Sequence, residues 1–425
     1  MLQRIAASYR EAYRGVPRNV WLIALTLLVS RSGTMVLPFL SIYVTRELGF
    51  RPLDVGWLLA TYGLGAIGGG LLGGWLTARC GAMRVQIGSL ALSMPGFVVL
   101  GQLDHFLSVC IGLFCLSIAI EAFRPACGTA TVNFCSHRSQ HTRAMAVNRL
   151  AVNLGMSIGP PVGGFLAALN YELLFWANAA TAGAAMLLML VLFGWKADSA
   201  ITGSSGSGTR SADQPTKEGP DTGRSPWADP RYLVFLLFNI LGAVVFFQFL
   251  GTYPLYLNEQ YRLQEHQIGL LYGVNTVVIV LFELVLINYV RRFSMMRIFA
   301  WGQLLSCLGF GLLPLAAGAE WAVACAWCVA TMLILTLGEM LSMPIGMAYV
   351  AQRSTTTNRG PYMGLYSTSF SVALLVSPVI GLKIYEINPH LLWYLCLILG
   401  AGVFLGLLAI ADREDRDVRQ SADGG

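Results

Sequence analysis

The feature that most constrains this chain is a series of long apolar runs separated by short polar breaks. The hydrocarbon core of a bilayer is crossed by about 20 apolar residues of α-helix. Because a span must satisfy its own backbone hydrogen bonds, helices and closed barrels are the structures that can cross. The runs therefore predict an all-α membrane protein with twelve transmembrane helices. We expect the spans at residues 18–43, 53–78, 84–103, 106–133, 144–168, 172–195, 232–257, 266–290, 297–317, 320–349, 361–385 and 388–411.

Composition excludes a soluble globular domain. Of the 425 residues, 56% are hydrophobic and 12% are charged, and the mean hydropathy is +0.62. A soluble domain carries about 25% charged residues. Such a chain needs lipid around it, and we expect membrane lipid among its partners.

The basic residues are distributed unevenly between alternate breaks. If both termini are cytoplasmic, most of the 28 Lys and Arg residues flank the cytoplasmic ends of the spans, and the outer breaks hold Arg46, Arg51, Arg262 and Lys383. The positive-inside rule requires this asymmetry. It predicts a multi-pass protein of the plasma membrane, of the bacterial inner-membrane kind, with both termini cytoplasmic. It also accounts for the net charge of +6 without a nucleic-acid partner.

A polar, Gly/Ser-rich stretch follows the sixth span and divides the chain. Stretches of this composition form flexible linkers. The predicted organisation has five parts: a cytoplasmic N-terminal segment at 1–17, a six-helix bundle at 18–196, a cytoplasmic linker at 197–230, a second six-helix bundle at 231–411 and a cytoplasmic tail at 412–425.

The two halves repeat each other weakly. In spans 2 and 8 an interval of 23 residues separates a glycine from an arginine: Gly56 and Arg79, then Gly269 and Arg292. In spans 5 and 11 a methionine leads a proline by 15 residues and a glycine by 18: Met145, Pro160 and Gly163, then Met363, Pro378 and Gly381. A third match, one residue out of step, pairs Glu121 and Pro125 with Glu339 and Pro344. The matches predict two pseudo-symmetric bundles, which is a transporter architecture with its site near the midplane.

Two stretches resemble motifs of the major facilitator superfamily. The break between spans 2 and 3, Gly74-Trp-Leu-Thr-Ala-Arg79-Cys-Gly81-Ala-Met-Arg84, is similar to the family's signature loop, Gly-x-Leu-Ala-Asp-Arg-x-Gly-Arg-Arg/Lys. Span 5 resembles the antiporter motif of the drug–proton antiporter branch, which points toward export. The loop departs from the family where its latching aspartate falls on Ala78. The resemblance implies that spans 1, 4, 7 and 10 line a central cavity, and it assigns conformational roles to Gly74, Arg79, Gly81, Arg84, Gly155, Gly159, Pro160, Gly163 and Gly164.

Charged residues inside spans are the candidate substrate and proton-coupling residues. Each costs at least about 2.5–3.5 kcal/mol on insertion scales, yet the chain keeps six: Arg31, Glu121, Arg124, Arg149, Glu283 and Glu339. Glu121 and Arg124 are three residues apart, so they share a helix face and can pair. With Arg149 they form either a static ion-pair cluster or a substrate or proton site, and both interpretations stay open.

The remaining charges also carry alternatives. Glu339 has no basic neighbour in span 10 and is the first choice for a proton carrier, against a pair with another span or with loop arginines. For Glu283 the alternative is a pair with Arg291 or Arg292. Arg31 indicates either an anionic group on the substrate or a glutamate partner.

No motif for a hydrolase, metalloprotease or nucleotide-binding enzyme is present. We expect no enzyme activity, catalytic residue, cofactor or metal. The sequence predicts a secondary active transporter, a monomer, that exports a small amphipathic solute by proton antiport with alternating access. Two alternatives stay open: an importer or facilitator of a peptide, sugar or metabolite on the same fold, and a membrane sensor or binding protein that transports nothing.

Overall fold

The computed structural model describes residues 15–135, 137–194, 225–290, 292–354 and 358–423. Within these ranges, twelve helices are long and apolar enough to span a bilayer, which confirms the predicted number. Most of the N-terminal segment at 1–17 and most of the linker at 197–230 lie outside the described residues.

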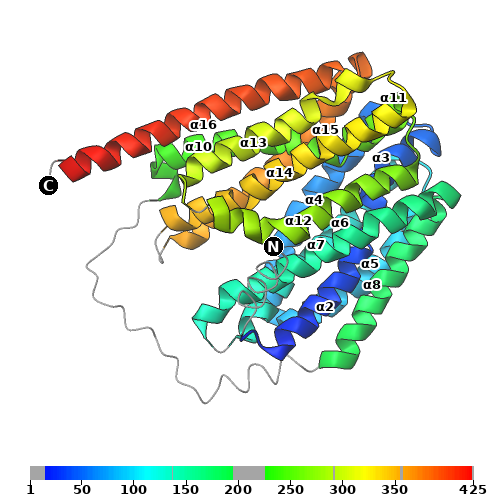
Figure 1. Ribbon diagram of the computed structural model, residues 1–425. Coiled ribbons are helices and arrows are strands. Elements are labelled where there is room, and N and C mark those ends of the chain that lie inside the picture. Colours follow the sequence, from blue (N-terminus) through cyan, green and yellow to red (C-terminus); the bar gives the residue numbers. More distant parts are fainter. Residues whose placement is uncertain (1–14, 136, 195–224, 291, 355–357, 424–425) are drawn as a thin grey trace. The chain divides into compact units, whose positions relative to one another are not determined.

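The helices of the first half run from blue to green in Figure 1. Their bounds are α2 (Arg18–Ser32), α3 (Val36–Arg46), α4 (Pro52–Cys80), α5 (Ala82–Leu100), α6 (Phe106–Asn133), α7 (Arg138–Leu169) and α8 (Glu172–Phe193). The second half contains α10 (Pro230–Phe246), α11 (Thr252–Gln260), α12 (Glu265–Val290), α13 (Met295–Gly311), α14 (Trp321–Arg353), α15 (Arg359–Ile387) and α16 (Leu391–Asp423). Short 3-10 helices are η1 (Pro226–Ala228), η2 (Phe247–Phe249) and η3 (Leu313–Ala316).

The first span of each half is interrupted. Between α2 and α3 the chain leaves the helix at Gly33–Met35, after Ser30, Arg31 and Ser32. Serine and glycine are weak helix formers because serine competes for backbone hydrogen bonds and glycine costs backbone entropy. Ser32 shows this competition, since its hydroxyl donates to the carbonyl of Val29 (2.8 Å). In the second half, η2 and a short break separate α10 from α11 in the same way.

Contacts group the chain into two compact units. The first comprises Met1–Phe39 and Thr61–Thr222, and the second comprises Leu40–Ala60 and Gly223–Gly425. The C-terminal end of span 1 and the start of span 2 therefore belong to the second unit. There, Arg46 Nη1 lies 3.0 Å from Glu265 Oε1, and the backbone N–H of Leu53 donates to Glu386 Oε1 (2.9 Å).

The helices of the two units pack in matching pairs. In the first unit, α2 packs on α7 and α8, while α5 packs on α6 and α8. In the second unit, α10 packs on α15 and α16, while α13 packs on α14 and α16. Figure 1 shows the last of these pairs, with the long α16 beside α13. The predicted pseudo-symmetric six-helix halves are thus confirmed in their packing.

Glycines in α4 allow that helix to approach α6. A Cβ on Gly69 would lie 2.6 Å from the carbonyl oxygen of Ile118, and one on Gly73 would lie 2.5 Å from Cα of Ala122. Close approach through small residues is the usual way in which membrane helices pack. Gly70 and Gly74 of the same helix face open space.

Candidate functional site

The first unit places a charged cluster near the middle of its fourth span. Glu121 accepts a hydrogen bond from Nη1 of Arg124 (3.3 Å) and from the hydroxyl of Tyr62 on α4 (3.4 Å). The Glu121 side chain is 13% exposed, whereas that of Arg124 is 70% exposed. The predicted pair between Glu121 and Arg124 is therefore formed, with a tyrosine as a third member that the sequence interpretation missed.

The second unit has a corresponding carboxylate on α14. Oε2 of Glu339 accepts a hydrogen bond from Nδ2 of Asn275 on α12 (3.1 Å). Nδ2 of Asn275 also lies 3.0 Å from the hydroxyl of Thr336, one turn from Glu339. Asn275 is 3% exposed. The partner of Glu339 is thus another span, as one of the two sequence interpretations expected, and the bond shown is to a neutral amide.

The two hydrogen-bonded pairs occupy equivalent positions in the repeat. Tyr62 and Asn275 each lie six residues after the matching glycines, Gly56 and Gly269. Glu121 and Glu339 each lie 24 residues before the matching methionines, Met145 and Met363. The glutamates are therefore in register, and Pro344 is the residue that is out of step. Each unit holds a mid-span carboxylate of its fourth helix with a polar side chain of its second helix.

Arg31 is held where the first span breaks, against three glycines of α7. A Cβ on Gly155 would lie 2.6 Å from Cβ of Arg31. One on Gly159 would lie 2.9 Å from the carbonyl oxygen of Ser32, and one on Gly163 would lie 2.9 Å from Cβ of Met35. These glycines recur every four residues and form one face of the helix. They give the carbonyls of the helix break room to lie directly on α7, which runs unbroken through Pro160 and Pro161.

The second unit makes the same contacts with different residues. Ser377 is the repeat equivalent of Gly159, and its hydroxyl donates to the carbonyl of Val244 (2.6 Å). Val244 stands where the first unit has Arg31. Gly381, equivalent to Gly163, packs against the side chain of Gln248, which stands where the first unit has Met35. The contact between the first and fifth spans is repeated, but the arginine is not.

Two further predicted residues lie on α7 and α12. Arg149 is half-buried in the first part of α7, beside Asn148, whose amide donates to the hydroxyl of Thr131 on α6 (2.7 Å). Glu283 is buried in α12. Of its two predicted partners, Arg291 lies outside the described residues, and the guanidinium of Arg292 stacks on the rings of Tyr289 and Phe293.

The predicted signature loop is the tight connection between α4 and α5. Gly81 has a φ of +95°, which only glycine adopts readily. The guanidinium of Arg79 is exposed and lies 4.1 Å from the centroid of the Trp75 ring. Arg84 is half-buried in the first turn of α5, and Gly164 is buried in α7. Ala78, where the family has an acid, is exposed.

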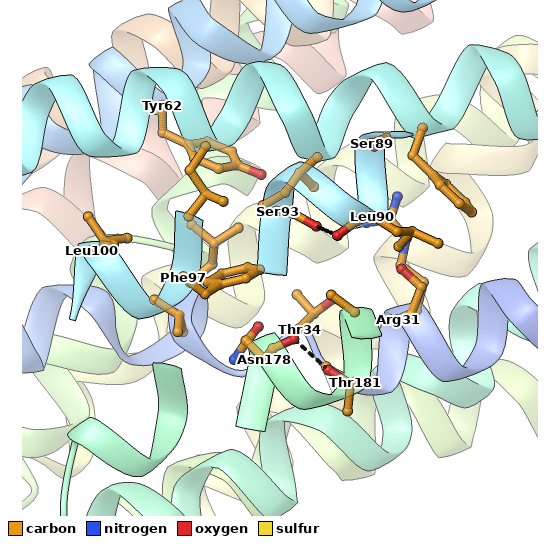
Figure 2. A pocket seen from close by; sticks show the side chains of 18 of the residues that line it. Arg31, Thr34, Tyr62, Ser89, Leu90, Ser93, Phe97, Leu100, Asn178 and Thr181 are labelled. Carbon is orange, nitrogen blue, oxygen red and sulfur yellow. Dashed lines mark hydrogen bonds between the residues drawn. The ribbon is translucent and has the colours of Figure 1, made fainter. Parts of the chain in front are cut away.

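A pocket with an empty volume of about 740 Å³ lies within the first unit. Helices α2, α5, α6 and α8 supply most of its wall, and α3 and α4 add a few residues. Figure 2 shows Arg31, Tyr62, Asn178 and Thr181 among the residues around it. Arg31 and Tyr62 therefore line a cavity, while Arg124 is exposed on the unit's surface.

Sequence reasoning missed Tyr62 and Asn275 because neither carries a charge. Both are polar residues in otherwise apolar spans, and only the repeat distinguishes them from structural hydroxyls and amides. They could have been found by comparing the polar positions of spans 2 and 8, counted from Gly56 and Gly269, because both lie six residues after the matching glycine.

Sequence comparison identifies the family of the fold. The family model of the Major Facilitator Superfamily matches residues 22–339 and 239–425. A Na(+), Li(+), K(+)/H(+) antiporter of Planococcus maritimus is 22% identical over 393 residues, which cover 83% of this chain and 85% of the relative. An uncharacterized MFS-type transporter of Bacillus subtilis (strain 168) is 22% identical over 369 residues, covering 85% of each chain.

Solved structures share the architecture. A peptide transporter, POT, in complex with sulfate superposes with a TM-score of 0.77 at 16% identity, covering 97% of this chain and 98% of the other. A POT family transporter in complex with 5-aminolevulinic acid has a TM-score of 0.77 at 14% identity, over 94% and 96% of the two chains. The nucleoside transporter NupG has a TM-score of 0.70 at 15% identity, over 92% and 98%. At these identities the likeness shows the fold alone.

Proposed function

Since the chain belongs to the Major Facilitator Superfamily of membrane transporters, we propose that it is a secondary active transporter that exports a small amphipathic solute in exchange for protons. The protein is an integral, multi-pass membrane protein, and transporters of this kind are not enzymes. In the proposed cycle, two helical bundles joined by the linker at 197–230 rock about a bound solute and expose it alternately to the two sides. The six intramembrane charges and the motif glycines named above are its proposed working parts.

The observation that carries the proposal is the pair of mid-span glutamates, Glu121 and Glu339, at equivalent positions of the two halves. A carboxylate in the hydrocarbon region is costly and marks a proton or ion path by default. Exchange of a proton for a solute needs at least one such group that changes its protonation state during the cycle.

Glu339 is the proposed proton carrier because of the chemistry of its amide partner. The side chain of Asn275 donates to Oε2 of Glu339. An asparagine amide has both donors and an acceptor, so after rotation it can accept a hydrogen bond from the protonated acid. This partner therefore accommodates both protonation states, which an arginine, being a donor only, does not.

Glu121 is proposed to act on the solute side. Its partner Arg124 exposes 70% of its side chain near the middle of a span. An arginine at that depth needs water or a polar partner. The proposal therefore places a wet path beside this face of α6, where a cationic group of a solute competes with Arg124 for Glu121.

Two findings bear on the coupling ion and the direction. The relative from Planococcus maritimus is named as an antiporter that exchanges monovalent cations for protons, which supports proton coupling. It also favours a second candidate function, exchange of Na⁺, Li⁺ or K⁺ for protons. In that case the oxygen atoms of Glu339, Asn275 and Thr336 would supply cation ligands. Export is supported by the glycine and proline pattern at 155–164.

The test uses the full chain in proteoliposomes with an imposed pH gradient and a pH-sensitive dye inside. Addition of a lipophilic organic cation, or of Na⁺, Li⁺ or K⁺, should dissipate the gradient if that solute is exchanged. Glu339→Gln and Glu121→Gln are compared with Glu172→Gln, a carboxylate in the first turn of α8. At least one of the two site variants should abolish gradient-driven accumulation while solute-for-solute exchange persists.

The outcomes separate the candidates. Full pH-dependent transport in both site variants would refute the proton assignment. Accumulation driven by the opposite gradient orientation would show an importer. Saturable solute binding without any flux would show a sensor or binding protein instead of a transporter.

A further inference from the structure

The pocket of the first unit lies wholly within that unit, because every residue that lines it belongs to the unit. A ligand seated there is carried by one unit.

The wall of this pocket changes from polar to apolar along its length. On α5 four of the five lining residues follow one helix face in the order Ser89, Ser93, Phe97 and Leu100, and Leu90 is the fifth. The eleven steps along the helix from Ser89 to Leu100 rise about 16 Å at the pitch of an α-helix. In Figure 2, Arg31 lies at the opposite end of the pocket from Leu100. The site is therefore elongated, with a cation at one end and a hydrocarbon surface at the other.

Among the described residues of the wall, one buried polar atom has no hydrogen-bond partner. The hydroxyl of Ser93 donates to the carbonyl of Leu90 (3.0 Å), and that of Thr181 donates to the carbonyl of Ala177 (2.9 Å). These donors are used within their own helices. Nε of Arg31, by contrast, is buried and has no hydrogen-bond partner among the described residues. A buried donor without a hydrogen-bond partner is unfavourable, and a carboxylate is a group whose geometry fits a guanidinium.

We propose that this pocket binds an amphipathic organic monoanion, with its carboxylate at Arg31 and its apolar body along Phe97 toward Leu100. A medium-chain fatty acid is the simplest molecule of this class. Tyr62 lines the pocket and donates to Glu121, so the bound anion contacts a residue that holds the carboxylate of the charged cluster. The inference goes beyond the proposed transport function and does not rest on it.

The experiment measures binding of octanoate to the full-length protein in lipid nanodiscs, by thermal shift and by displacement of radiolabelled octanoate. Octan-1-ol at the same concentration has the same apolar body without the charge. Arg31→Gln removes the cation, and Ser93→Leu fills the middle of the pocket without touching Arg31. Arg18→Gln, an exposed arginine at the start of the same helix, is the matched control.

Octanoate should raise the melting temperature where octan-1-ol does not, and Arg31→Gln should weaken octanoate binding at least tenfold. Ser93→Leu should abolish binding in a protein that still melts cooperatively, and Arg18→Gln should bind like the wild type. Equal stabilisation by octanoate and octan-1-ol overturns the proposal, and this comparison needs no variant to fold. Retention of wild-type affinity in Arg31→Gln also overturns it. Loss of transport in the proteoliposome assay would not, because binding is read without flux.

Discussion

At the residue scale, the two equivalent glutamates differ in the partners that hold them. Glu121 is paired with the cation Arg124, and the bond from Tyr62 is long at 3.4 Å. Glu339 has a shorter bond, 3.1 Å, from a neutral amide. An arginine and a tyrosine thus bond to the carboxylate of one half, and an amide bonds to the carboxylate of the other. The proposed function assigns the first carboxylate to the solute and the second to the proton.

The hydrogen bond from the Asn275 amide to Glu339 predicts unequal effects of two matched substitutions. A hydrogen bond to a charged group contributes about 1.5–3 kcal/mol. We therefore expect Asn275→Leu to slow gradient-driven transport in proteoliposomes about tenfold or more. Tyr62→Phe removes a bond that is near the geometric limit and should slow it by less than about threefold. Thr276→Val, whose hydroxyl bonds to its own helix (3.1 Å), serves as the control. A wild-type rate of gradient-driven transport in Asn275→Leu would contradict the role of Glu339 as the proton carrier.

Asp229 holds three elements together at one end of the second unit. Its carboxylate accepts from Nε and Nη2 of Arg353 at the end of α14 (2.7 and 2.8 Å). It also caps α10 through the N–H of Tyr232 (3.2 Å) and accepts from the hydroxyl of Tyr362 on α15 (3.1 Å). Although partial burial works to raise the pKa of Asp229, the hydrogen bonds from Arg353, Tyr232 and Tyr362 hold it below its usual range.

This depressed pKa predicts how stability responds to acid. A carboxyl whose pKa is lower in the folded state stabilises the fold above its unfolded pKa, about 3.9, and loses that contribution as the pH falls through the folded pKa. At pH 7, Asp229→Asn should lower the free energy of unfolding by about 2 kcal/mol, because the charge of Arg353 is left partly buried. The gap between variant and wild-type melting temperatures should narrow as the pH falls below about 4 and close below the folded pKa. Asp104→Asn, an exposed residue, should open no gap. An Asp229→Asn gap that stays constant as the pH falls below the unfolded pKa of about 3.9 would contradict the account.

At the element scale, the glycine face of α7 sets where the first span breaks and where Arg31 lies. We expect Gly155→Ala and Gly159→Ala each to cost about 1–3 kcal/mol, because the added Cβ overpacks a close contact between two helices. Gly128→Ala on α6 meets nothing within 4 Å and should be neutral or stabilising, since alanine is the better helix former. Melting temperatures in detergent measure all three. If Gly159→Ala raised the melting temperature, α2 and α7 would not approach as closely as described.

The same element shows what sequence could and could not predict. The twelve spans were predictable because length and hydropathy alone decide them. The breaks at Gly33–Met35 and at η2 were not, because both lie inside runs that remain apolar enough to read as continuous. Likewise, α16 continues to Asp423 past the predicted end at 411, since its charged last turns have good helix formers that a hydropathy criterion excludes.

At the scale of the whole molecule, duplication is what made part of the site predictable. Matching intervals in the sequence pick out Glu121 and Glu339, because charges in apolar spans stand out. Their partners Tyr62 and Asn275 differ in chemistry between the halves, so no residue-type pattern links them. The pocket at Arg31 was also beyond the sequence, because a cavity depends on how side chains of several helices fail to fill a space.

The uneven distribution of basic residues predicts the orientation of the entire chain. Each Lys or Arg near an anionic cytoplasmic surface contributes about 1 kcal/mol, so we expect the many positive charges on one side to hold the linker and both termini in the cytoplasm. A protease site placed in the linker at 197–230 should be cut in inverted membrane vesicles and resist cleavage in intact spheroplasts. The same site placed in the break at 101–105, between α5 and α6, should show the reverse pattern. If the linker site is cut in spheroplasts, the charge argument fails and the assignment of inner and outer ends changes for every span, because an even number of helices ties both termini and the linker to one side.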